Sequence, residues 1–344
     1  MPVYIDTSGN PIDREANLTS PSRRAILRLA ERSTHCVTIG LVNNMSDAAF
    51  RATERQFVSL LEGASEEIPV RLVLYALPGI QRKGGSRHHA ESFYSSVESL
   101  GQTRLDGLIV TGREPLTPDL RSETYWESFT GLLGWARENT YSTVWSCLAA
   151  HAAVLHLDGI ERRKSEQKHF GVLECTRMQF HPLLTGAPSR FCVPHSRWNG
   201  VAEEELADRG YSVLARSDCA GVDTFVKQDK SLFIFFQGHP EYEADTLLRE
   251  YRRDAARYLR GESDSYPLIP AGYFNLATAE ALESLRVEAL ERRNEQLLER
   301  VSAVLENPEI ENTWRTTAAV IYRNWLKHIC ARKAEQKVNR VQFA

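Results

Sequence analysis

The sequence of 344 residues contains no uninterrupted apolar run of about 18 residues, the length that a membrane-spanning helix needs. Its beginning, MPVYIDTSGNPIDREANLTSPSRR, also lacks the apolar stretch of a secretory signal peptide. We therefore expect a cytoplasmic protein that has no membrane partner.

An excess of one sign of charge is also absent. The 42 lysines and arginines are balanced by 45 aspartates and glutamates, which gives a net charge of −3 with neutral histidines. Such a balance provides no field that would attract nucleic acid or an anionic membrane. The composition therefore favours a small-molecule substrate and predicts no nucleic-acid partner.

Cysteine is scarce, and no two cysteines have the C-x-x-C spacing of a zinc site or a redox pair. We expect no bound metal, and most of the thiols should be buried in a reducing compartment. A reactive cysteine therefore has to be recognised by its surroundings. The six cysteines are Cys36, Cys147, Cys175, Cys192, Cys219 and Cys330.

The sequence has an ordinary globular composition, 42% hydrophobic and 25% charged, and two kinds of hydrophobic pattern follow each other along the chain. Short apolar runs alternate with stretches of helical periodicity in the first half of the chain. This alternation predicts a three-layer α/β sandwich in which helices cover both faces of a mostly parallel sheet. Strands are expected at 37–42, 70–77, 105–110 and 142–145, and helices at 49–61, 90–100, 123–139 and 148–157.

The rest of the pattern divides the chain into three parts. Residues 1–29 form an N-terminal arm leading into a short basic helix at 22–32, residues 30–274 form the main domain, and residues 275–344 form a helical C-terminal extension that packs on it. Short β-like pieces after about residue 171 indicate a mixed or antiparallel extension of the sheet. These pieces are 191–193, 211–215, 221–226 and 232–236; helices at 243–259, 277–305 and 314–333 follow, with a loop at 261–272 that wraps back.

The segment Thr143–His151 (TVWSCLAAH) passes directly from a predicted strand into a predicted helix, with Cys147 at the junction. This is the geometry of a nucleophile elbow. A thiol there lies near the positive end of the helix dipole, which favours the thiolate, and nearby backbone N–H groups can stabilise an oxyanion. A buried structural cysteine is the alternative that this segment alone leaves open.

A second segment, Phe236–Tyr242 (FQGHPEY), comes at the end of the apolar run 232–236. Residues two apart in an extended chain face the same way, so Glu241 can hold the imidazole of His239 in one tautomer. Together with Cys147 they supply the nucleophile, the base and the orienting carboxylate of a catalytic triad. The alternative is an exposed His-Pro turn beside a solvated glutamate.

With these residues the chain resembles the homoserine O-succinyltransferases, a family with the class I glutamine amidotransferase-like fold. The resemblance implies an O-acyltransferase of methionine biosynthesis that uses homoserine and acyl-CoA as small-molecule substrates and has no permanently bound cofactor. It runs in order from about residue 37 to 254 and returns near 314–326. Besides Cys147, the matching segments are Ile39–Met45, Asp106–Gly112, Tyr125–Trp126, Ser142–Thr143, Pro194–Arg197, Gly238–Tyr242 and Tyr251–Asp254.

The resemblance also implies a ping-pong mechanism. Cys147 attacks the acyl-CoA thioester and carries the acyl group, while backbone N–H groups near Gly112–Arg113 and Leu148 stabilise the oxyanion. Coenzyme A then leaves. His239, held by Glu241, takes the proton from the homoserine hydroxyl as that oxygen attacks the acyl-enzyme.

Three substrate contacts are implied in the same way, namely Lys168, Ser196 and Arg253. A guanidinium at Arg253 could grip an amino-acid carboxylate through two N–H donors. Without the resemblance, the three would be interpreted as a surface lysine, a turn serine and a solvated arginine. Further polar residues in or near these motifs are candidates for supporting roles: His151, His169, His195 and Arg197.

Two departures from the family pattern concern the pocket wall and the acyl donor. Leu148 and His151 stand where family members often have tryptophan and glutamine. Leu116 occupies the position that helps to choose between acetyl and succinyl donors, and it is neither the glycine that leaves room for succinate nor the glutamate that blocks it. We predict succinyl-CoA, because Leu116 carries no charge to repel a succinyl tail, while the neighbouring Arg113 could attract the tail and Glu114 could repel it.

Several alternatives stay open. Acetyl-CoA could be the donor and serine the acceptor, since one methylene is worth only about 1–3 kcal/mol in a pocket. A glutamine amidotransferase or glutaminase shares the fold and triad, but its elbow usually reads Gly-x-Cys-x-Gly, where this chain has Trp145 and Ala149. A non-catalytic binding protein is the alternative of another class. Helix 277–305 could also serve assembly into a homodimer.

Overall fold

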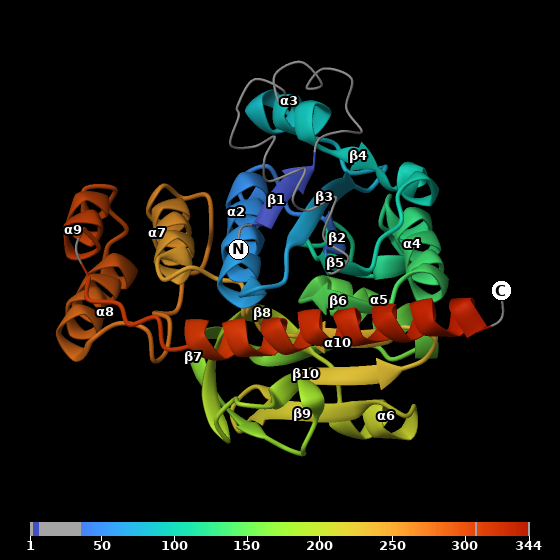
Figure 1. Ribbon diagram of the computed structural model, residues 1–344. Coiled ribbons are helices and arrows are strands. Elements are labelled where there is room, and N and C mark those ends of the chain that lie inside the picture. The colour runs from blue at the N-terminus through green and yellow to red at the C-terminus, as the bar shows by residue number, and fades with distance from the viewer. Residues whose placement is uncertain (1–2, 7–35, 307, 343–344) are drawn as a thin grey trace.

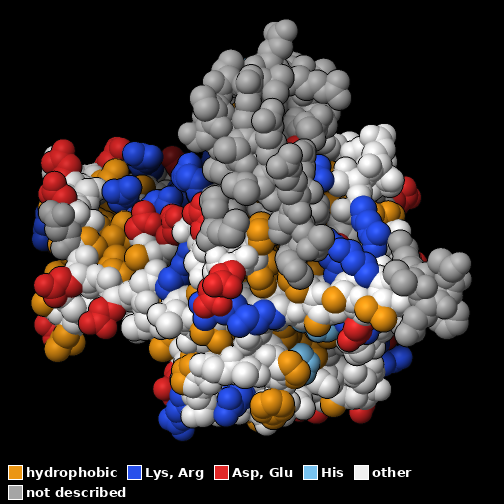
Figure 2. Space-filling view, in the orientation of Figure 1, with side chains coloured by type: hydrophobic (Ala, Val, Ile, Leu, Met, Phe, Trp, Pro, Cys, Tyr) orange, Lys and Arg blue, Asp and Glu red, His pale blue; other side chains and the backbone are white. Residues whose placement is uncertain are grey.

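The computed structural model describes residues 3–6, 36–306 and 308–342 of the chain (Figure 1). The short basic helix expected at 22–32 lies outside these ranges. In the described part of the chain, no helix is both long enough and apolar enough to cross a bilayer. Figure 2 shows basic and acidic side chains interspersed over the visible face.

One mixed sheet organises the molecule, with the strand order β1-β3-β2-β5-β6-β11-β10-β9-β7-β8 and β4 paired to β3. The first six strands of this order are parallel: β1 (Val3–Asp6), β3 (Val70–Ala76), β2 (Val37–Val42), β5 (Gly107–Thr111), β6 (Ser142–Ser146) and β11 (Leu232–Phe236). The remaining strands are antiparallel: β10 (Gly221–Gln228), β9 (Ser212–Ser217), β7 (Arg163–Arg177) and β8 (Arg190–Gly200). The mostly parallel sheet with its antiparallel extension is as predicted.

Helices cover both faces of the parallel half. Strands β2, β5, β6 and β11 are buried along their whole length, as expected for apolar, β-branched strands between two helical layers. One layer contains α2 (Phe50–Ser65) and α10 (Arg315–Gln342), which pack against each other. The other layer contains α4 (Trp126–Asn139) and α5 (Leu148–Asp158). Figure 1 shows α10 running across the sheet, so this part of the C-terminal extension completes the sandwich.

Three helices form a separate cluster beside the sheet (Figure 1): α7 (Thr246–Leu259), α8 (Leu276–Glu291) and α9 (Leu297–Val304). The prediction of one helix over 277–305 is wrong, because the chain turns between α8 and α9. Asn294 makes that turn by accepting a hydrogen bond from the Gln296 N–H at 2.9 Å. The turn lets the apolar residues of both helices pack on α7 in one core.

Other differences from the predicted elements have local causes. The helix expected at 90–100 is replaced by α3 (Gly84–Phe93), β4 (Ser95–Ser96) and a 3₁₀ turn, η1 (Val97–Gln102). Tyr94 ends α3 because its ring packs on Phe50 with centroids 4.7 Å apart and its hydroxyl donates to Glu54 Oε2 at 2.8 Å. Residues 3–6 of the expected arm pair with β3 as an edge strand. Shorter elements are η2 (Leu120–Ser122), η3 (Pro182–Leu184) and α6 (Glu203–Asp208).

Residues 163–177 form the long strand β7, and Gly171 lies within it. Its backbone is bridged to the loop that wraps back from α7: the Ala271 N–H donates to Phe170 O at 2.9 Å, and the Val172 N–H donates to Ala271 O at 2.8 Å. A Cβ at position 171 would lie 2.2 Å from Ala271 O, so only glycine permits this approach. The bridge places β7 and its Lys168 beside α7.

Candidate active site

A cavity of about 870 Å³ opens at the carboxyl ends of β5, β6 and β11. Ligands bind at this edge in α/β sheets. The residues that line it come from distant parts of the chain, and they include every predicted site residue except Leu116. The predicted site residues that line the cavity are Gly112, Arg113, Cys147, Leu148, Lys168, Ser196, His239, Glu241 and Arg253.

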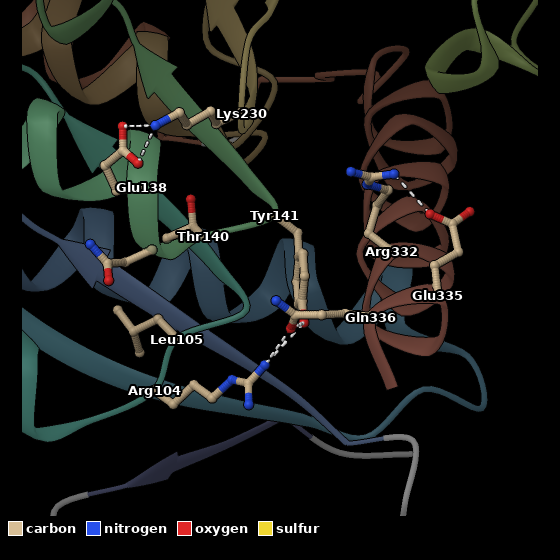
Figure 3. A pocket seen from close by; sticks show the side chains of 10 residues that line it. Arg104, Leu105, Glu138, Thr140, Tyr141, Lys230, Arg332, Glu335 and Gln336 are labelled. Atoms are coloured by element: carbon tan, nitrogen blue, oxygen red, sulfur yellow. Dashed lines mark hydrogen bonds and ion pairs between the residues drawn. The ribbon is translucent and has the colours of Figure 1, made fainter. Parts of the chain in front are cut away.

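A second cavity, of about 510 Å³, lies at the opposite end of the sheet, beside Leu105 before β5 and Tyr141 before β6 (Figure 3). Four of its charged side chains form ion pairs, Lys230 with Glu138 at 2.7 Å and Arg332 with Glu335 at 2.8 Å, and Arg104 bonds to Gln336. None of the described residues that line it is a cysteine or a histidine. The reactive groups are therefore gathered in the larger cavity.

Cys147 lies at the turn between β6 and α5 in a strained backbone conformation, with φ of 53° and ψ of −114°. A positive φ is rare for a residue other than glycine, and it costs about 1–3 kcal/mol. The turn is held in place because the Cys147 N–H donates to Phe236 O at 2.7 Å. This strained turn is the predicted nucleophile elbow, and it presents the thiol at the N-terminus of α5.

His239 and Glu241 lie next to each other at the same edge, where the chain leaves β11. The His239 Nδ1 and Glu241 Oε1 atoms are 2.9 Å apart, and both side chains are buried. Tyr242 stacks on the imidazole with ring centroids 4.2 Å apart. The carboxylate fixes the tautomer with the proton on Nδ1 when the ring is neutral, so Nε2 is left for the nucleophile or the substrate.

The electrostatics of this group favour a charged imidazole. Burial alone would lower the pKa of His239, but a thiolate at Cys147 and the carboxylate of Glu241 hold it well above its ordinary value. The negative charges around the ring therefore favour the protonated form of His239. A thiolate next to an imidazolium is the form in which cysteine acts as a nucleophile.

The strand end at Gly112 packs directly against the start of α5. A Cβ on Gly112 would lie 2.7 Å from the Leu148 amide nitrogen and 2.8 Å from that of Ala149. The Gly112 N–H itself donates to Ser146 O at 3.1 Å, so it is not free to bind an oxyanion. The Leu148 N–H at the first position of the helix lacks an intrahelical partner. Gly112 is thus a spacer against the start of α5, and oxyanion binding by the N–H groups of its neighbours Arg113 and Leu148 stays a prediction.

The three predicted substrate contacts lie on one side of the cavity. Lys168 projects from β7, with its ammonium 4.0 Å from Asp254 Oδ2, and burial lowers its pKa although Glu250 and Asp254 act in the opposite direction. The Ser196 hydroxyl donates to Glu250 Oε2 at 2.6 Å. Arg253 is half-exposed, and its hydrogen bond to Asp254 at 2.8 Å raises its pKa. The structure therefore brings these three residues together, and it places two carboxylates, those of Glu250 and Asp254, beside them.

Leu116 does not belong to this cavity. Its side chain is 73% exposed, and its N–H donates to Glu123 Oε1 at 2.6 Å. The loop around it turns outward after Pro115, which still lines the cavity. The structure therefore offers no contact between Leu116 and an acyl group bound at Cys147.

Two residues that sequence reasoning missed complete the wall. Glu250 accepts hydrogen bonds from both Ser196 and the Tyr242 hydroxyl, the latter at 2.8 Å. It lies three residues before Arg253, a helical spacing that puts both side chains on one face of α7. Two sequence signals could have identified these residues: the three-residue spacing from Glu250 to Arg253, and the position of Tyr242 directly after the His-Pro-Glu turn.

Of the supporting candidates, His151, His195 and Arg197 are buried, whereas His169 is half-buried and lies 2.9 Å from Ser165 Oγ. Arg197 Nε donates to His195 Nδ1 at 3.2 Å, His195 Nε2 lies 3.4 Å from Asp223 Oδ1, and the Gly238 N–H donates to Asp223 Oδ1 at 3.0 Å. Cys175 also lies close enough to His195 and Asp223 for the three to share a metal ion. The residues do not suit a cation, because the Arg197 bond leaves the proton of His195 on the Nε2 that faces Asp223. His151 is buried and bonds to Gln237 Oε1 at 2.8 Å.

A strained elbow cysteine with a buried histidine and glutamate is an arrangement typical of enzymes that form covalent cysteine intermediates. Comparison with known proteins gives the family. Residues 22–336 match the family model described as homoserine O-succinyltransferase. The chain belongs to the homoserine O-succinyltransferase family. The predicted family is thereby confirmed, and the class of enzyme is an acyltransferase.

Individual relatives agree with this assignment. The chain is 48% identical to a homoserine O-succinyltransferase of Rhodopseudomonas palustris, covering 95% of this chain and 98% of that protein. It is 42% identical to one of Bradyrhizobium japonicum, covering 85% and 90%. Among solved structures, a glutamine amido transferase from Methylobacillus flagellatus is 16% identical, with a TM-score of 0.48, covering 86% of this chain and 96% of that one.

Proposed function

We propose that this enzyme transfers a succinyl group from succinyl-CoA to the hydroxyl of homoserine through a thioester on Cys147. The observation that carries the proposal is the strained elbow at Cys147 in one cavity with the His239–Glu241 pair, whose atoms are 2.9 Å apart. The family, with relatives named as homoserine O-succinyltransferases, supports the choice of substrates.

In the first half-reaction, the Cys147 thiolate attacks the thioester carbonyl carbon of the donor. The negative charge moves to the carbonyl oxygen, which the Leu148 N–H and the Arg113 N–H stabilise. The carbon–sulfur bond to coenzyme A then breaks, and the leaving thiolate takes the proton that the His239 imidazolium holds. The products are the acyl-enzyme, free coenzyme A and a neutral His239.

In the second half-reaction, homoserine enters the space that coenzyme A has left. His239 Nε2 accepts the proton of the hydroxyl as its oxygen attacks the acyl carbon, and Glu241 stabilises the imidazolium that forms. The bond to Cys147 breaks, which restores the thiolate beside a protonated His239. The released product is an O-acyl amino acid. No bound metal or prosthetic group takes part in these steps.

Charges of both signs on the cavity wall suit a zwitterionic amino acid. Arg253 and Lys168 supply the positive charges, with Glu250 and Asp254 as the nearby carboxylates. In our proposal Arg253 binds the acceptor carboxylate in a bidentate manner, while Lys168 and Ser196 complete the acceptor site.

We also propose a cytoplasmic homodimer built from an acyltransferase domain at 30–274 and helices from 275 onward that pack on it. Support for assembly comes from α8, on which Leu276, Val287 and Leu290 are exposed. Their spacing of eleven and three residues puts the three on one face of α8, and an exposed apolar face favours association. Sedimentation of the wild type and of Leu290→Glu tests this, and an unchanged monomer in both would contradict it.

The experiment that tests the function measures kcat/KM for succinyl-CoA and acetyl-CoA, each with homoserine and with serine. We expect the succinyl-CoA and homoserine pair to be preferred at least tenfold over each alternative. A tenfold preference for acetyl-CoA would overturn the donor, and a preference for serine would overturn the acceptor. Release of ammonia from glutamine without acyl transfer would replace the proposal with a glutaminase.

A further inference from the structure

Arg113 is a cation that lines the active-site cavity without a carboxylate partner. Its Nε is buried and has no hydrogen-bond partner, and the guanidinium forms no ion pair with any residue the structure describes. The contact that it does make is weak, because its Cζ lies 5.9 Å from the ring centroid of Tyr125. A guanidinium left this way lacks the charge-assisted bonds that stabilise arginines elsewhere in proteins.

Several other cations that line the cavity are already engaged. Arg253 and Lys168 share Asp254, and Arg249 lies 3.0 Å from Asp245. Glu114, although next to Arg113 in the chain, acts electrostatically on Lys168 and Arg253, on the acceptor side of the cavity. Arg113 therefore stands apart from the charges that would hold the acceptor.

The acidic groups on the other side of Arg113 are also occupied. Asp47 lies 3.7 Å from Arg82, a buried arginine whose pKa is lowered by burial and, to a smaller extent, by the positive charge of Arg113. Glu123 Oε1 accepts hydrogen bonds from the N–H groups of Leu116 and Thr117. The protein thus places a second guanidinium near Arg113, and no carboxylate of the described residues forms an ion pair with it.

The position of Arg113 relates it to the acyl group. It follows Gly112, which packs on the Leu148 amide at the oxyanion site. In a succinyl group the free carboxylate carbon lies three bonds from the reacting carbonyl carbon, about the 3.8 Å step between consecutive Cα atoms. An arginine side chain one residue from the oxyanion site can span that distance, whereas an acetyl group ends before it.

We propose that Arg113 binds the free carboxylate of the donor's acyl group and thereby selects a dicarboxylic acyl-CoA over acetyl-CoA. The inference rests on the proposed acyl transfer through Cys147 and adds the residue that reads the donor. Leu116, which is exposed and outside the cavity, has no part in this choice.

The test compares three substitutions by kcat/KM for succinyl-CoA and acetyl-CoA with homoserine. Arg113→Met removes the charge at similar length, and Arg113→Lys keeps the charge but loses the planar fork. Arg121→Met is the matched control, since Arg121 is exposed, lies outside the cavity and pairs with Asp119 on the surface. Thermal midpoints of all variants show whether they fold.

With Arg113→Met we expect the succinyl-CoA value to fall at least tenfold, equivalent to about 1.4 kcal/mol in the transition state, while the acetyl-CoA value changes less than twofold. Arg113→Lys should lie between Arg113→Met and the wild type, and Arg121→Met should match the wild type. An equal loss with both donors would overturn the inference, because it would assign Arg113 to the phosphates of coenzyme A or to the fold.

Two further outcomes separate this inference from the proposed function. Unchanged donor values in a folded Arg113→Met, or a wild type that prefers acetyl-CoA, would overturn the inference and leave acyl transfer intact. A wild type that transfers neither acyl group would overturn the proposed function and the inference with it.

Discussion

Replacing Gly112 by alanine probes the contact between the end of β5 and the start of α5. The added Cβ would lie 2.6 Å from Leu148 Cβ, 2.7 Å from its amide nitrogen and 2.8 Å from the Ala149 amide nitrogen. Ordinary contacts begin at 3.4 Å, so the overlap is about 0.7 Å. Two of these atoms belong to the backbone, and a side-chain rotation cannot relieve the overlap.

The helix start must therefore move away from the strand by several tenths of an ångström. The Leu148 N–H is the proposed oxyanion donor nearest to this overlap, and loss of one such donor lowers kcat by about 10² to 10³-fold. Overpacking should also cost about 1–3 kcal/mol of stability. We expect slower acylation of Cys147 in an enzyme that still folds.

The assay is the single-turnover release of coenzyme A from succinyl-CoA, with the free energy of unfolding measured in parallel. Gly131→Ala is the matched control, because Gly131 lies within α4 and a Cβ there would meet nothing within 4 Å. It should leave acylation unchanged and stabilise the helix by about 0.5–1 kcal/mol. An acylation rate in Gly112→Ala within threefold of the wild type would refute the placement of the oxyanion site.

Two further predictions concern the acceptor site and pH. Arg253→Lys should raise KM for homoserine strongly while coenzyme A release in a single turnover keeps its rate, since the lysine loses the planar fork; an unchanged KM would return Arg253 to the solvated surface. Burial lowers the pKa of His151 from 6.5 to about 4, so the folded state binds fewer protons than the unfolded state between these values. The stabilisation from neutral His151 is complete above pH 6.5 and is lost as the pH falls towards 4, by about 3 kcal/mol. Denaturant unfolding at pH 7 and pH 4.5 should therefore show a larger loss for the wild type than for His151→Gln, and equal losses would contradict this.

The parallel half of the sheet could be predicted from the sequence because each strand is a continuous apolar run between helical periods. The elbow at Cys147 and the pairing of His239 with Glu241 followed from their positions at strand ends. What failed depended on contacts between distant segments. The end of α3 at Tyr94 is set by Glu54, and the backbone bridge of β7 is set by Ala271; neither partner is visible in a local pattern.

The candidate site shows the same limit. The sequence named the residues of the cavity, but it could not show which cations there already have partners. Arg113 and Glu114 are neighbours in the chain, yet the charge of Glu114 acts on Lys168 whereas that of Arg113 acts on Arg82. Leu116 aligned with a family position that determines specificity, whereas the loop turns its side chain to solvent. Charge pairing and loop direction are properties of the folded chain.

The central claim is that Cys147 carries the acyl group, and mass spectrometry of the enzyme mixed with succinyl-CoA and no acceptor tests it most directly. We predict one succinyl group per chain on the peptide that contains Cys147, released when homoserine is added. Cys219→Ser, which changes an exposed cysteine, should be labelled like the wild type, and Cys147→Ala should remain unlabelled. A succinyl group on another residue, or full activity of Cys147→Ala, would contradict the account.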